Sequence, residues 1–184
     1  GADAVKFQTH NVEDEQLNID ITSPHFTGSD RYNWVSRNDR STPLAFWQEL
    51  KAYCEALDII FFSTPMSRGA AQKLSRVGVP LWKVGSGDVQ DNVALEYMCD
   101  SGKPIIISTG MVALTELDEV VAFITQRTAA PLALLYCISK YPCPPGDFNL
   151  GTIEYFKEKY PQCTIGFSDH SLGYDVALAA VQLG

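Results

Sequence analysis

Six short runs of nearly continuous apolar residues are the feature of this sequence that most restricts its fold. They span residues 4–8, 59–64, 81–86, 104–109, 132–139 and 164–170. Runs of this length are typical of strands covered on both faces, as in a parallel sheet. The pattern therefore favours a parallel sheet over a hairpin meander or a helical bundle.

Segments with helical starts and stops lie between these runs. Thr42 and Pro43 predict the N-cap and first position of a helix whose apolar residues recur as far as Leu57. Ser67 predicts the cap of a second helix that stops at Gly78. Further helices are expected from Thr115 with Asp118, over residues 153–160 and over residues 175–183. Strands alternating with helices predict an α/β architecture.

Residues 9–41 interrupt this alternation. They are polar and contain Pro24 and Gly28, so we expect a long loop across one face of the molecule. His10 and His25 fall within it and are expected to be solvated or to cover a substrate.

Composition excludes several classes of partner. A net charge of −8 over 184 residues argues against a general nucleic-acid or membrane-surface binder, so an anion site would have to be local. The five cysteines form no CxxC pair, which favours reduced thiols in a cytoplasmic protein. No run is long enough to span a bilayer, and no secretory signal is visible.

Each predicted strand ends in small, polar or ionisable residues. In a parallel sheet these ends lie on one side, and in a closed barrel they converge on the mouth where ligands bind. The endings are Gln8-Thr9, Ser63-Thr64, Ser86-Gly87-Asp88, Ser108-Thr109-Gly110, Ser139-Lys140-Tyr141 and Ser168-Asp169-His170. The repetition indicates a ligand site at these ends.

Two lysines lie inside the apolar runs. Lys83 lies in the stretch LWKVGSGD, residues 81–88, and Lys6 lies in the first run. A buried ammonium is costly unless it meets an anion or loses its proton. A strand lysine can also extend outwards to water, but two of them beside hydroxyl-rich strand ends favour a phosphate site.

His170 and Tyr141 leave more than one interpretation open. At a strand end, His170 fits a metal ligand, a proton carrier or an ordinary loop histidine. Tyr141 precedes Pro142 in a rigid turn, where it could contact a substrate or pack the loop.

The motifs KFQ, FFSTP, WKVGSGD, KPIIISTGM, CISKYP and GFSDHSLG occur in an order that resembles the sialic acid synthase family, the N-acetylneuraminate synthases and related nonulosonic acid synthases. The resemblance covers essentially the whole chain. It implies a TIM (β/α)8 barrel with transferase activity and a homodimer of the full-length protein. The implied reaction condenses phosphoenolpyruvate with an N-acylated amino-hexose such as N-acetylmannosamine, releases phosphate and uses a divalent Mn or Mg ion.

The resemblance also implies roles for particular residues. Gln8 and Tyr141 would contact the sugar, and His170 would bind the metal. At Ser139 some bacterial members carry asparagine, which would change the reach of that contact. Phosphoenolpyruvate contacts would come from Lys6, Thr64, Lys83, Ser86, Ser108, Ser139 and Ser168. Of all the residues with an implied role, the catalytic ones would be Lys6, Lys83 and His170.

About six strand–helix units fall short of a closed eight-stranded barrel. We therefore expect residues 1–184 to be a partial barrel domain. The family's first and eighth strands and its C-terminal antifreeze-like domain would lie outside this sequence.

Two other functions stay open from the sequence. Lys83 could form a Schiff base with pyruvate in a class I aldolase. Alternatively, the chain could be a non-catalytic sugar-phosphate-binding barrel that acts as a sensor or scaffold.

Overall fold

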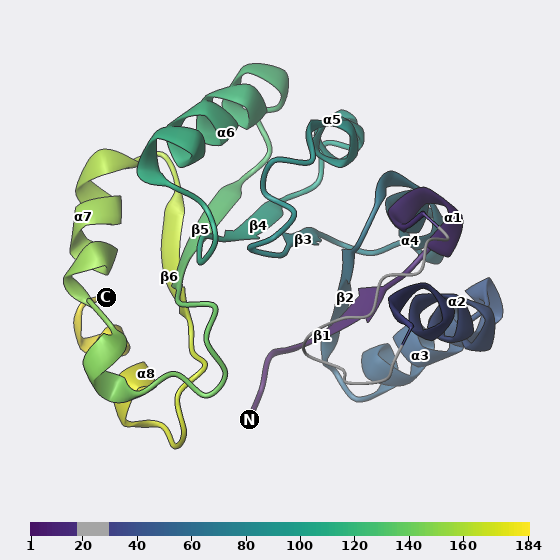
Figure 1. Cartoon of the computed structure of the whole chain (residues 1–184), viewed down its shortest axis with the longest axis horizontal. Coiled ribbons are helices and arrows are strands. Elements are labelled where there is room, and N and C mark those ends of the chain that lie inside the picture. The colour runs from purple at the N-terminus through teal and green to yellow at the C-terminus, as the bar shows by residue number, and fades with distance from the viewer. Residues whose placement is uncertain (18–29) are drawn as a thin grey trace. The chain divides into compact units, whose positions relative to one another are not determined.

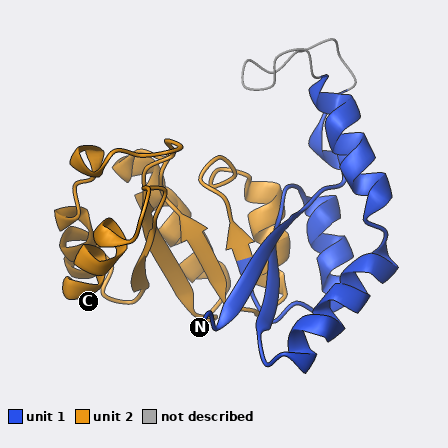
Figure 2. Ribbon diagram, turned by 90° about the horizontal axis from the view of Figure 1, so that it is seen from below, with its two compact units in different colours: residues 1–82 blue, residues 83–184 orange. Residues whose placement is uncertain are grey.

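A computed structural model of the chain describes residues 1–17 and 30–184. The chain forms two compact units, residues 1–82 and residues 83–184, which Figure 2 shows in separate colours. The boundary falls inside the short strand β3 (Trp82–Val84).

The first unit contains a two-stranded parallel sheet. Strand β1 (Ala4–Thr9) pairs with β2 (Ile60–Pro65). The helices are α1 (Val12–Glu15), α2 (Arg31–Ser41), α3 (Leu44–Ala56) and α4 (Arg68–Val77). Phe7 and Phe61 stack with ring centroids 5.6 Å apart, and Trp47 of α3 packs within 6.3 Å of both rings. One face of the β1–β2 pair is therefore covered by helix.

The second unit contains a four-stranded sheet in the order β3-β4-β5-β6. Strand β4 (Ile105–Ser108) is parallel to β5 (Leu132–Cys137), which is parallel to β6 (Thr164–Ser168). The helices are α5 (Asn92–Asp100), α6 (Leu114–Arg127), α7 (Gly151–Lys159) and α8 (Asp175–Gln182), with a 3₁₀ turn, η1 (Pro145–Asp147). Figure 1 shows α5, α6 and α7 on one side of this sheet.

The two faces of the four-stranded sheet differ in chemistry. Ile107, Leu134 and Ile165 lie in register on one face, and the first two are fully buried. Full burial of Ile107 and of Leu134 contributes about 1.5–3 kcal/mol for each side chain. Ser108 and Ser168 belong to the opposite face, because side chains alternate along a strand. The second face therefore carries polar groups where the strands end.

All six strand predictions are confirmed, with ends that differ by at most two residues. The structure thus establishes an α/β fold with parallel sheets. Closure into a barrel is not part of this finding and stays a prediction.

The helix predictions are confirmed with shifted starts. Ser67 Oγ accepts a hydrogen bond from the Ala70 backbone N–H at 3.2 Å, and Gly78 ends α4 with φ of 81°. Pro43, not Thr42, is the N-cap of α3, because Thr42 closes the helix before it. Helix α6 begins at Leu114 and α7 at Gly151, one and two residues before the predicted starts, whereas α8 begins at Asp175 as predicted. Helix α5 was not predicted.

The prediction of a loop throughout residues 9–41 is wrong over 12–15 and over 31–41, where the structure has helices α1 and α2. Asp30 starts α2 by accepting from the Tyr32 and Asn33 backbone N–H groups at 2.9 and 3.3 Å. The polar composition hid the helix, although Val35 is fully buried. Pro24, His25 and Gly28 lie outside the described residues.

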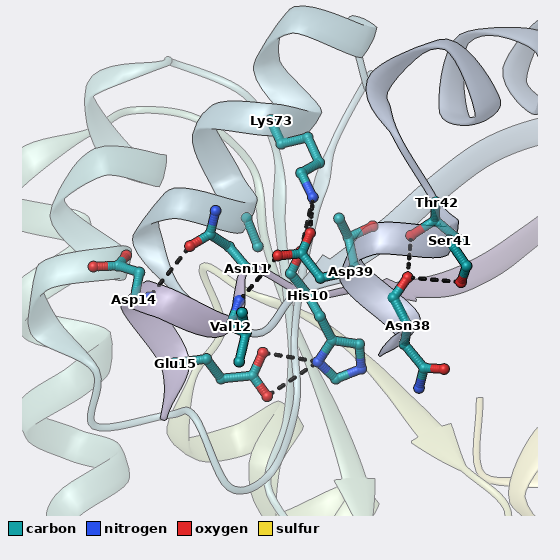
Figure 3. Close-up of polar contacts among 12 residues, drawn as sticks. His10, Asn11, Val12, Asp14, Glu15, Asn38, Asp39, Ser41, Thr42 and Lys73 are labelled. Carbon is teal, nitrogen blue, oxygen red and sulfur yellow. Dashed lines mark hydrogen bonds and ion pairs between the residues drawn. The ribbon is translucent and has the colours of Figure 1, made fainter. Parts of the chain in front are cut away.

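His10 is buried rather than solvated. Its Nδ1 lies 2.8 Å from Glu15 Oε2, and its ring meets Trp34 edge-on at 5.7 Å. Lys73 of α4 donates to the His10 carbonyl at 3.0 Å and pairs with Asp39 of α2 (Figure 3). This polar cluster ties α1, α2 and α4 together within the first unit.

All five cysteines are free thiols, as predicted. Within the described residues, no helix combines the length and the apolar character needed to cross a membrane.

A polar link between α6 and α7 predicts a stability change at high pH. Tyr160 donates to Asp118 Oδ1 at 2.8 Å, and burial with this hydrogen bond raises the pKa of Tyr160 to about 12. Unfolded tyrosine has a pKa of about 10, so the folded state keeps a proton that the unfolded state loses. The contribution is fully present below about pH 10 and is lost as the pH rises through about 12.

We expect Tyr160→Phe to lower the free energy of unfolding by about 1 kcal/mol at pH 8, the net value of one hydrogen bond. Its deficit relative to wild type should shrink between pH 10 and 12. Urea unfolding of both proteins at several pH values measures this difference. A deficit that does not change with pH would contradict the assignment.

Candidate functional site

Lys83 lies in the middle of β3, and its side chain is 6% exposed. Its ammonium donates to the Val84 carbonyl at 2.6 Å and to Ser108 Oγ at 2.7 Å. Two short hydrogen bonds offset part of the cost of removing the cation from water. The structure therefore turns this lysine towards the polar face of the sheet rather than outwards.

Ser108 extends this contact across the sheet. Its Oγ lies 2.9 Å from Ser168 Oγ, which comes from the end of β6 two strands away. Ser108 is itself buried. The ammonium from β3 is thus aligned with two hydroxyls at the ends of β4 and β6. These three groups could donate to several oxygens of one anion.

Ser86 and Ser139 lie on loops beside this row, and both approach Gly110. Ser86 Oγ accepts a hydrogen bond from the Gly110 backbone N–H at 3.0 Å. A Cβ at Gly110 would lie 2.5 Å from Ser139 Oγ and 3.1 Å from the Ser139 backbone N. The loops after β3, β4 and β5 therefore approach so closely that only hydrogen fits at Gly110.

His170 and Tyr141 lie together beyond the strand ends. Their ring centroids are 4.1 Å apart, and His170 Nδ1 lies 2.7 Å from the Ile138 carbonyl. Tyr141 is 72% exposed, and desolvation of its hydroxyl, followed by the nearby Cys137, raises its pKa. An exposed ring beside the site suits contact with a ligand.

The other three predicted residues belong to the first unit. Lys6 pairs in register with Phe62 and Gln8 with Thr64, so these side chains share the face opposite the stacked Phe7 and Phe61. Lys6 and Gln8 are exposed, whereas Thr64 is buried. Partial desolvation lowers the pKa of Lys6.

The structure thus groups the predicted residues into two sets, one in each unit. Lys83, Ser108 and Ser168 form one connected array, with Ser86, Ser139, Tyr141 and His170 on the loops around it. Lys6, Gln8 and Thr64 form the second set.

Cys137 was not predicted as part of the site, and Gly110 was predicted only as one residue of a polar strand ending. Cys137 ends β5, and its Sγ lies 3.6 Å from Ser86 Oγ and 3.9 Å from His170 Nδ1. The STGM and CIS motifs contained both residues, but nothing in the sequence indicates that they touch.

The metal implied for His170 can be tested against the side chains present. The Ile138 carbonyl accepts from Nδ1, which places the proton there and leaves Nε2 as the ligand atom. Among residues 1–17 and 30–184, no three His, Cys, Asp or Glu side chains gather closely enough to hold a metal ion. His170 therefore fits one position of a metal site, and the described residues do not complete it.

The α/β fold with parallel sheets agrees with the resemblance to sialic acid synthases. Residues 1–184 match the NeuB family over their whole length, and the chain belongs to this family.

Individual relatives agree with this assignment. The chain is 34% identical over 184 residues to an uncharacterized protein of Methanocaldococcus jannaschii, covering all of this chain and 51% of that protein. It is 31% identical over 189 residues to N-acetylneuraminate-9-phosphate synthase of Homo sapiens, covering all of this chain and 52% of the relative. The chain spans about half the length of the curated relatives it matches.

A solved relative has the same fold. The crystal structure of N-acetylneuraminic acid synthetase from Leptospira borgpetersenii serovar Hardjo-bovis, in complex with citrate, superposes with a TM-score of 0.84 at 32% identity. The match covers all of this chain and 60% of that one.

The close approach at Gly110 gives a testable consequence. We expect Gly110→Ala to destabilise the protein by about 1–3 kcal/mol, because the added methyl group collides with the Ser139 backbone as well as its hydroxyl. Gly146→Ala is the matched control, since a Cβ there meets nothing within 4 Å. Urea unfolding midpoints measure both effects, and equal midpoints for the two variants would contradict the packing described.

Proposed function

We propose that the protein condenses phosphoenolpyruvate with an N-acylated amino-hexose, giving a sialic acid-type nonulosonic acid and inorganic phosphate. The observation that carries this proposal is the hydrogen-bonded row of Lys83, Ser108 and Ser168, the first two of them buried, in a NeuB family member. Relatives of the chain include synthases of N-acetylneuraminate 9-phosphate, of N,N'-diacetyllegionaminic acid and of pseudaminic acid.

The row suits the donor substrate. Phosphoenolpyruvate carries a phosphate and a carboxylate, so its recognition requires a cation and several donors held in fixed positions. We assign Lys83, Ser86, Ser108, Ser139 and Ser168 to this donor in the second unit. The resemblance adds Lys6 and Thr64, of the first unit, as phosphoenolpyruvate contacts.

The sugar contacts are assigned to Gln8 and Tyr141. The amide of Gln8 can donate to or accept from a sugar hydroxyl, and the exposed ring of Tyr141 offers an apolar surface with a polar tip.

The proposed reaction joins carbon 3 of phosphoenolpyruvate to the aldehyde carbon of the open-chain sugar. Water then adds to carbon 2, and the bond from carbon 2 to the phosphate oxygen breaks, leaving a ketone and free phosphate. Lys83 and the serines would hold the departing phosphate throughout. Fixing two reactants in register accounts for roughly 7 kcal/mol or more of barrier reduction in well-oriented systems.

His170 would provide one ligand, through Nε2, for a divalent Mn or Mg ion. Such an ion supplies a Lewis acid that polarises the aldehyde oxygen. The hydrogen bond from Nδ1 to the Ile138 carbonyl would keep the ring oriented for this role.

We further propose that the chain forms part of a (β/α)8 barrel in a cytoplasmic homodimer. The α/β fold with parallel strands and the five free thiols are compatible with these proposals.

Replacing Lys83 tests the donor site. In the full-length protein, we expect Lys83→Ala to reduce kcat/KM for phosphoenolpyruvate by about a hundredfold or more, because a buried charge-assisted contact is lost. Lys157→Ala is the control, since Lys157 is exposed on α7. The assay is phosphate release, which should require both phosphoenolpyruvate and N-acetylmannosamine. Near-normal kinetics of Lys83→Ala would refute the assigned role.

The aldolase and scaffold alternatives give different results. A Schiff base would leave a stable adduct on Lys83 after borohydride treatment with pyruvate, and we expect none. A non-catalytic barrel would release no phosphate with any sugar. Mass spectrometry across a panel of N-acylated hexosamines should detect a product whose mass equals both substrates plus water minus phosphoric acid.

A further inference from the structure

We infer that Cys137 is a positioning residue that orients the Ser86 hydroxyl towards the phosphoenolpyruvate site. This inference rests on the proposed function. Cys137 is the last residue of β5 and is 5% exposed. It lies on the same sheet face as Ser168, its partner in the β5–β6 register.

The thiol touches three of the loops that surround the site. Its Sγ lies 3.6 Å from Ser86 Oγ after β3 and 3.9 Å from His170 Nδ1 after β6. A Cβ at Gly110, after β4, would lie 2.9 Å from the same sulfur. The sulfur therefore fills the space enclosed by these loops.

The hydrogen bonds of Ser86 give the contact a direction. Ser86 Oγ accepts from the Gly110 backbone N–H at 3.0 Å, so one lone pair is occupied and the hydroxyl proton points to the sulfur. Because a thiol sulfur is a weak acceptor, the Ser86 O–H can exchange it readily for a charged oxygen. In the free protein the two contacts fix the Ser86 side chain in one rotamer, and its O–H can then turn from the sulfur to a phosphate or carboxylate oxygen.

A buried cysteine can also be a small apolar residue with a packing role alone. The two roles predict different rankings of the Cys137 variants by their affinity for phosphoenolpyruvate. Packing alone gives no advantage to Cys137→Ser over Cys137→Ala, because a buried hydroxyl replaces an apolar surface. Positioning predicts that Cys137→Ser retains an acceptor for Ser86 and therefore retains affinity for the donor.

The experiment is a double-mutant cycle between Cys137 and Ser86 in the full-length protein. We expect Cys137→Ala to raise KM for phosphoenolpyruvate about three- to tenfold, because the Ser86 side chain then has to be ordered when the donor binds, with little change in KM for the sugar. Cys137→Ser should stay within about twofold of wild type by the same reasoning. In a Ser86→Ala background, Cys137→Ala should add no further loss.

Calorimetric titration with phosphoenolpyruvate measures the same affinities without turnover. Cys99→Ala, in α5, is the control for loss of a buried thiol, and its affinity should equal that of wild type. If Cys137→Ala does not fold, Cys137→Val removes the acceptor while filling the space and should give the same increase in KM.

The outcomes separate this inference from the proposed function. Additive losses in the cycle, or equal losses for Cys137→Ser and Cys137→Ala, overturn the inference while leaving the donor site intact. Unchanged affinity in Ser86→Ala removes Ser86 from the donor site and overturns the inference with it. Absence of phosphate release by the wild-type protein, with phosphoenolpyruvate and the sugar panel, overturns the proposed function itself.

Discussion

The buried ammonium of Lys83 is the constraint on which the rest of the second unit depends. A cation that is 6% exposed must keep hydrogen-bond acceptors close by, and Ser108 Oγ provides one only if β4 lies beside β3 with its end at the same level. Ser108 in turn lies 2.9 Å from Ser168, which requires the β4–β5–β6 register. The alignment of the strands and the formation of the array are therefore one structural requirement.

Much of the fold could be predicted because its signals are local. The apolar runs identify the strands, and the Ser67 cap and the left-handed Gly78 identify the limits of α4. The position of Lys83 inside such a run indicated a polar partner from outside the run, and the contact with Ser108 agrees with that interpretation. Each of these inferences depends only on a residue and its neighbours in the sequence.

Other features depend on contacts between distant residues, which a sequence pattern does not encode. Helix α2 is mostly polar, and its burial is concentrated around Val35, so its composition resembled a loop. The approach of Gly110 to Ser139, and of Cys137 to Ser86, follows from the packing of separate loops. His10 likewise acquires its partner Glu15 only once α1 has formed.

Strand β3 has three residues, and its neighbouring side chains point to opposite faces of the sheet. Trp82 and Val84 are buried on the face away from the one that receives Lys83. Inserting or deleting a single residue between Gly78 and Trp82 would exchange the two faces and direct an indole towards the serine hydroxyls. The connection between α4 and β3 therefore has a fixed length, whereas the exposed turn at Gly146 has room for changes of length.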